Sequence, residues 1–157
     1  MKNKDSSHSK NALRAWIQLL KSVKRIESQM NSHFVTEHGS SMSRFDVLAN
    51  LDRCPNKKAS TSQLSSMLLS SKGNITRLLD RMEDDGLVKR TTSTKDKRIS
   101  EVAMTDSGKK LFSLLAADHE QWINSLFEEI SNDDLLKLID MMSNLRNKMG
   151  DTDVEAD

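Results

Sequence analysis

Helix breakers and cross-linking residues are scarce in this sequence of 157 residues. It contains one proline, five glycines and a single cysteine, Cys54. So few breakers favour helix over most of the chain. One cysteine excludes an intrachain disulfide and a zinc site built from several cysteines. We interpret Cys54 as an inert thiol, because the chain holds no second cysteine to resolve an oxidised form.

Long apolar runs are also missing. No stretch approaches the roughly 20 apolar residues that cross a bilayer, and residues 1–10 are polar where a signal peptide would have an apolar centre. We therefore expect a cytoplasmic protein with no membrane partner. A chain of 157 residues favours one domain, residues 1–157.

Charge is nearly balanced overall but uneven along the chain. The net charge is +1, yet residues 1–40 carry +4, residues 41–105 carry +4 and residues 106–157 carry −7. A basic first part and an acidic last part indicate a polyanionic partner for the first part only. Solvated helix faces with randomly placed charge would give the same numbers.

Apolar residues three and four positions apart predict most of the secondary structure as helix. One capping box, Ser60 with Gln63, marks a helix start. Residues 1–9 and 150–157 are expected to be disordered. Helices are predicted over residues 10–38, 43–53, 72–85, 106–130 and 133–149, and over a shorter segment that starts at the Ser60 cap and ends near Leu68 or Leu69.

The period changes from 3.6 to 2 after Gly86. Residues 87–91 and 100–104 alternate as two short strands, and the segment between them is polar and basic. Two short helices followed by a basic hairpin make a winged helix-turn-helix. The expected fold class is therefore mainly α with a small β-hairpin wing.

The second helix of that pair carries side chains suited to DNA. Its apolar side anchors it, and its outer side offers hydrogen-bond donors to base edges in the major groove. Serines at its start suit a phosphate, and cations at the hairpin tip suit the backbone or a minor groove. A solvated helix face and a flexible basic loop remain alternatives. The candidate residues are Ser70, Ser71, Lys72, Asn74, Thr76, Arg77, Lys95, Lys97 and Arg98.

Residues 10–149 resemble a regulator of the MarR family. The resemblance is carried by residues 74–90, NITRLLDRMEDDGLVKR, by Asp96-Lys97-Arg98, and downstream by Val102, Met104, Thr105 and Gly108. It implies a homodimeric regulator, usually a repressor, on a pseudo-palindromic DNA operator. It also implies that Arg98 enters the minor groove, steered by Asp96. The family uses terminal helices as dimerisation helices, here residues 10–38 and 106–149, around a DNA-binding lobe of residues 43–105.

Residues 42–48 resemble relatives that respond to aromatic carboxylates such as hydroxycinnamates. The implied effector is a small aromatic acid. Trp16 and Phe45 would stack on its ring, Arg44 would bind its carboxylate, and Glu27 or His33 would complete the pocket. Alternatively, Trp16 and Phe45 are ordinary core residues and Arg44 pairs with Asp46 or Glu27.

No catalytic, cofactor or metal site is expected. The sequence has no His-Glu-x-x-His motif, no phosphate-binding glycine loop and no nucleophile elbow. The four histidines, His8, His33, His38 and His119, show no ligand spacing. Two rival functions remain: a constitutive DNA-binding protein without an effector, and a winged-helix module that binds other proteins.

Overall fold

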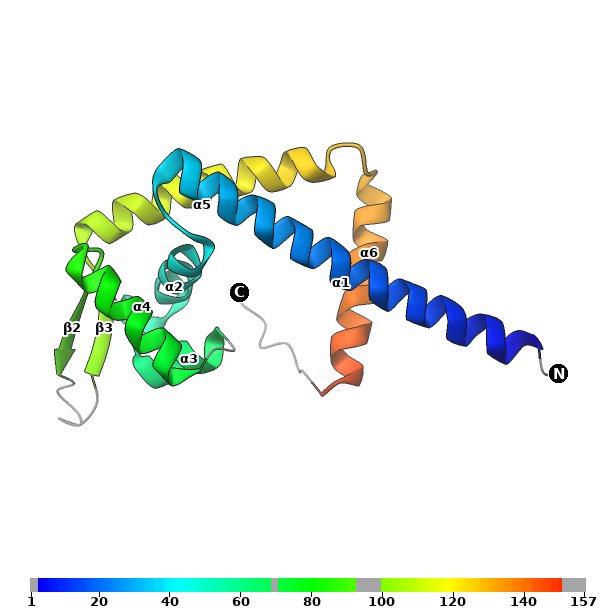
Figure 1. The fold of residues 1–157 in the computed structure, drawn as a ribbon, viewed down its shortest axis with the longest axis horizontal. Helices are drawn as coiled ribbons and strands as arrows, with labels where there is room; N and C mark the ends of the chain where they lie inside the picture. The colour runs from blue at the N-terminus through cyan, green and yellow to red at the C-terminus, as the bar shows by residue number, and fades with distance from the viewer. Residues whose placement is uncertain (1–2, 69–70, 93–99, 151–157) are drawn as a thin grey trace. The chain divides into compact units, whose positions relative to one another are not determined.

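The computed structural model describes residues 3–68, 71–92 and 100–150 (Figure 1). Helices dominate, as predicted, and one small antiparallel sheet accompanies them. The elements in chain order are α1 Asn3–His38, α2 Met42–Arg53, the short 3-10 helix η1 Pro55–Lys57, β1 Lys58–Ser60, α3 Thr61–Met67, α4 Lys72–Asp84, β2 Val88–Thr92, β3 Ser100–Met104, α5 Asp106–Phe127 and α6 Asn132–Lys148.

The chain divides into two compact units, Met1–Asp118 and His119–Asp157, with the boundary inside α5. The first unit contains α1 to α4, the sheet and the first half of α5. The second contains the rest of α5 and α6. None of the described helices combines the length and the apolar composition needed to cross a membrane.

The core of the first unit lies among α2, α3, α4 and the sheet, which Figure 1 shows gathered together. The predicted capping box opens α3, because the Ser60 hydroxyl accepts from the Gln63 amide while the Gln63 side chain accepts from the Ser60 amide. Each helix contributes one apolar side to the shared core. The core residues are Val47, Leu48, Leu51, Ala59, Leu64, Ile75, Leu79, Met82, Leu87, Val88, Val102 and Met104.

The sheet has the strand order β1-β3-β2, and both pairs are antiparallel. The predicted hairpin is confirmed as β2 and β3, with Arg90 opposite Val102. Strand β1 was not predicted, because three residues are too few to show a period of two. Ala59 of β1 lies opposite Val102 on the other side, so the central strand is paired on both edges.

Helix α1 begins earlier than the sequence analysis expected. We expected residues 1–9 to be disordered, but α1 starts at Asn3. Residues 3–9 contain no glycine or proline, and extending an existing helix costs much less than starting one. At the other end, Gly39 takes φ +60, the left-handed conformation that ends a helix. Residues 151–157 lie outside the described part of the chain.

The start of α5 is fixed against the end of the α4–β2 turn. The Thr105 amide donates to the Leu87 carbonyl at 3.0 Å, and the Thr105 hydroxyl caps α5 by accepting from the Gly108 amide at 3.0 Å. Gly108 itself is buried, and a Cβ placed on it would come within 2.0 Å of the Leu87 carbonyl oxygen. Only glycine allows this approach of two backbone segments.

We predict that Gly108→Ala lowers the free energy of unfolding by at least about 2 kcal/mol, because the added methyl group forces α5 away from Leu87. The measurement is urea denaturation followed by circular dichroism. Gly73→Ala is the matched control, since a Cβ there meets nothing within 4 Å. A Gly108→Ala protein as stable as the control would contradict the close approach.

Candidate nucleic-acid interface

Helix α4 is held by one side and starts at a defined residue. The Ser71 hydroxyl accepts from the Asn74 amide at 3.3 Å, which caps the helix. Ile75, Leu79 and Met82 are at most 3% exposed in the core. The burial of these three side chains determines which residues of α4 point to solvent.

The opposite side of α4 presents polar groups. Gly73, Asn74, Thr76 and Arg77 are all exposed. An asparagine amide both donates and accepts, and an arginine guanidinium offers five N–H donors in a planar fork. Among the described residues, the Arg77 side chain has no ion pair. A helix with such a face can enter the major groove of duplex DNA and address base edges.

An ion-pair network joins α4 to the strand that follows it. Arg90 of β2 donates through Nη2 to Asp80 Oδ1 at 2.7 Å and to the Thr76 carbonyl at 3.3 Å. The Arg90 backbone amide donates to Glu83 Oε1 at 2.8 Å. Asp80 is therefore paired with Arg90, although Arg81 is its neighbour. The network fixes the wing strand relative to the exposed face of α4.

A second ion pair joins α2 to the end of α4. Arg44 of α2 pairs with Asp85, which caps the C-terminus of α4. The sequence analysis named Asp46 and Glu27 as alternative partners of Arg44, and the ion pair found among the described residues is with Asp85. Together with the Arg90 network, this ion pair holds the segment between the end of α4 and strand β2 at both of its ends.

The structure places half of the candidate DNA-binding residues on one element. Asn74, Thr76 and Arg77 lie on the exposed face of α4 and Ser71 caps it. Lys72 lies in the first turn of α4. The remaining candidates, Ser70, Lys95, Asp96, Lys97 and Arg98, lie outside the described residues.

The candidate effector residues are not gathered in one place within a protomer. Trp16 is 56% exposed on α1 and lies 18 residues before Phe34, about 27 Å along the helix. Phe45 instead contacts the rings of Phe34 and Phe112, with centroids 5.5 and 6.0 Å apart. Phe45 therefore belongs to an aromatic cluster near the C-terminal end of α1, away from Trp16.

His33 is also engaged. Its Nε2 lies 2.8 Å from Asp118 Oδ2. Partial burial raises the pKa of the Asp118 carboxyl, but hydrogen bonds from His33 and His38 outweigh it and hold that pKa below its ordinary value. Asp118 is therefore ionised at neutral pH.

Two hollows border α2. The larger, about 530 Å³, lies between α1 and α2, and the smaller, about 310 Å³, lies between α2 and the start of α4. Ser43 and Asp46 line both. Glu27 and Lys24 line the larger one, and Asn74 lines the smaller. Of the described residues that line them, none is aromatic.

Comparison with known proteins identifies the lobe. Residues 41–100 match the model of the MarR family. The transcriptional repressor YetL of Bacillus subtilis is 27% identical over 132 residues, covering 82% of this chain and 79% of YetL. The uncharacterised regulator YkoM of the same organism is 34% identical over 104 residues, 66% of each chain. The chain belongs to the MarR family.

The fold of this MarR-family chain matches solved structures of the family. Sco3205 of Streptomyces coelicolor, a MarR-family regulator solved in complex with DNA, superposes with a TM-score of 0.78 at 18% identity, covering 92% of this chain and 90% of Sco3205. Members of the MarR family are transcriptional regulators and not enzymes.

Sequence reasoning missed Arg90 and its partners. The sequence does contain a signal for this network. Asp80 and Glu83 are acidic, and the basic Arg90 follows shortly after the turn at Gly86. Residues three apart on a helix share a face, and a strand that leaves the helix end can fold back onto that face. The pairing depends on how β2 packs, so the spacing alone did not identify it.

Proposed function

We propose that the protein is a homodimeric repressor that reads a pseudo-palindromic DNA operator, with α4 of each protomer in a major groove. The observation that carries this proposal is the outer face of α4. Asn74 and Arg77 are exposed there while the opposite side of the helix is fixed in the core. A bidentate arginine contact to guanine discriminates bases by about 1–3 kcal/mol.

The wing is proposed to complete the contact. Residues 41–105 carry a net charge of +4, which attracts the DNA backbone. In the proposal Lys95 and Lys97 bind phosphate and Arg98 enters the minor groove beside Asp96. The Arg90 network supports this arrangement, because it holds β2 against α4.

Dimerisation is supported by apolar surface that a single copy leaves exposed. On α1, side chains from Leu13 to Val23 point to solvent, and α6 has no buried residue. Apolar patches of this extent on a soluble domain mark contact surfaces. The exposed residues are Leu13, Trp16, Ile17, Leu20 and Val23 on α1, and Leu136, Leu138, Ile139, Met141 and Leu145 on α6.

Repression and its release form the last part of the proposal. The relative YetL carries the name of a repressor, and we propose the same role here. A small molecule bound in the hollow between α1 and α2, which Lys24, Glu27 and Asp46 line, would shift the population toward a form with poor operator affinity. A coupling free energy of about 1–3 kcal/mol gives a roughly 5–150-fold change. The hollow borders Ser43 and Asp46 of α2, which also border the start of α4.

We predict that Arg77→Ala relaxes base preference at one position of each half-site and costs about 1–3 kcal/mol on the preferred base. The measurement is fluorescence anisotropy against a duplex and its single-base variants, at several salt concentrations. The matched control is Arg25→Ala, which removes the same charge from α1. Equal weakening on every duplex would show that Arg77 contacts only the backbone. Wild-type affinity that does not fall with salt would contradict DNA binding through phosphates.

We also predict that Leu145→Glu converts the dimer to a monomer, because it places a charge within the apolar surface of α6. Light scattering after size-exclusion chromatography should give a mass of 17.8 kDa for this variant and twice that for the wild type. Asn147→Glu introduces the same side chain on the same helix at a polar position and should leave the dimer intact. A monomeric wild type, or a dimeric Leu145→Glu protein, would refute this interface.

A further inference from the structure

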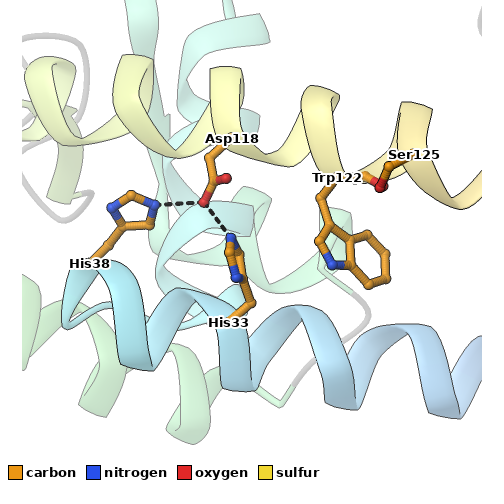
Figure 2. Close-up of polar contacts among 5 residues, drawn as sticks. All are labelled: His33, His38, Asp118, Trp122 and Ser125. Atoms are coloured by element: carbon orange, nitrogen blue, oxygen red, sulfur yellow. Dashed lines mark hydrogen bonds and ion pairs between the residues drawn. The ribbon is translucent and has the colours of Figure 1, made fainter.

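Three potential metal ligands meet beside the C-terminus of α1. His33 and His38 of α1 both point at Asp118 of α5, as Figure 2 shows. Their Nε2 atoms lie 2.8 and 2.6 Å from the same oxygen, Asp118 Oδ2. All three ligand atoms lie within 4.8 Å of one another. We call these three residues the His-His-Asp cluster.

The chemistry of the cluster suits a borderline transition metal. Neutral imidazole nitrogens and a carboxylate oxygen bind zinc at about 2.0–2.2 Å, which places ligand atoms roughly 3.3 Å apart in a tetrahedron. The two nitrogen–oxygen distances, 2.8 and 2.6 Å, are shorter than that, and the two nitrogen atoms lie within 4.8 Å of each other. Two imidazoles disfavour magnesium and calcium, which prefer oxygen ligands.

Access and electrostatics also favour a cation. The side chains of His33, Asp118 and His38 are 32%, 23% and 15% exposed, so an ion can reach them from solvent. Helix α1 ends at His38, and the C-terminus of a helix carries partial negative charge that stabilises a nearby cation. Three protein ligands leave a fourth position for water or another donor.

We propose that the His-His-Asp cluster is a binding site for one divalent metal ion of the zinc class. The ion bonds to Nε2 of His33, Nε2 of His38 and a carboxylate oxygen of Asp118, and water completes its coordination. It replaces the two hydrogen bonds to Asp118 with three metal–ligand bonds, and each neutral imidazole then carries its proton on Nδ1 instead of Nε2. The ion so cross-links the end of α1 to α5. The site is separate from the exposed face of α4, and its test requires no DNA.

Zinc binding to the full chain tests the proposal directly. Isothermal titration with zinc chloride, after removal of any purification tag, should show one ion per protomer. His33→Gln and His38→Gln should each weaken binding at least about tenfold. A glutamine amide still donates a hydrogen bond to Asp118 but is a poor zinc ligand, so these variants separate metal binding from a purely structural role. Magnesium at millimolar concentration should produce no heat of binding.

Two controls isolate the cluster. His8→Gln removes a histidine from an exposed position on the same helix, and Cys54→Ser removes the chain's thiol. Both variants should bind zinc as the wild type does. The proposal is overturned if the wild type takes up no zinc at about 100 µM, if the glutamine variants bind it unchanged, or if Cys54→Ser abolishes binding.

A measurement on the wild type alone guards against variants that fail to fold. Nuclear magnetic resonance of the imidazole nitrogens should show zinc-dependent shifts at Nε2 of His33 and His38, while the resonances of His8 stay in place. Shifts confined to other histidines, or none at all, would contradict the site.

Discussion

The burial of one side of α4 is the interaction on which the rest of the structure depends. Ile75, Leu79 and Met82 are essentially inaccessible to solvent, and each side chain of this kind contributes about 1.5–3 kcal/mol when fully buried. The Arg90 pairs are partly exposed, and pairs of that kind contribute at most about 1 kcal/mol each. Packing therefore sets the rotation of α4, and with it the outward position of Asn74 and Arg77. The ion pairs refine the position of β2 relative to that face.

Features set by neighbouring residues could be predicted from the sequence. The Ser60 capping box, the start of α4 after Ser71 and the β2–β3 hairpin all depend on local spacing, and the structure confirms them. Features set by packing could not be predicted. Arg44 pairs with Asp85, 41 residues away, and His33 meets Asp118, 85 residues away. The spacing of five between His33 and His38 hid the cluster, because ligands on one helix face are usually three or four apart.

The proposed function assigns DNA reading to the lobe of α2, α3, α4 and the sheet, and pairing of two copies to the apolar sides of α1 and α6. In that proposal the lobe presents α4 to DNA, and the buried core side chains and the ion pairs of Arg44 and Arg90 hold this helix in place. The exposed apolar side chains of α1 and α6 contribute no core to a single copy, and in the proposed dimer a second copy covers them. One reading helix contacts only a few base pairs, so specific affinity requires two of them about one turn of DNA apart. The proposed function therefore requires both the apolar surfaces of α1 and α6 and the polar face of α4.

Selection of bound duplexes from a random DNA pool tests this account most directly. The account predicts enrichment of a pseudo-palindrome whose half-sites are centred about 10 base pairs apart, since each α4 of the dimer enters one of two successive major grooves. A single enriched half-site would contradict paired reading. A pool that remains random after repeated rounds in low salt would contradict the assignment of α4 to DNA altogether.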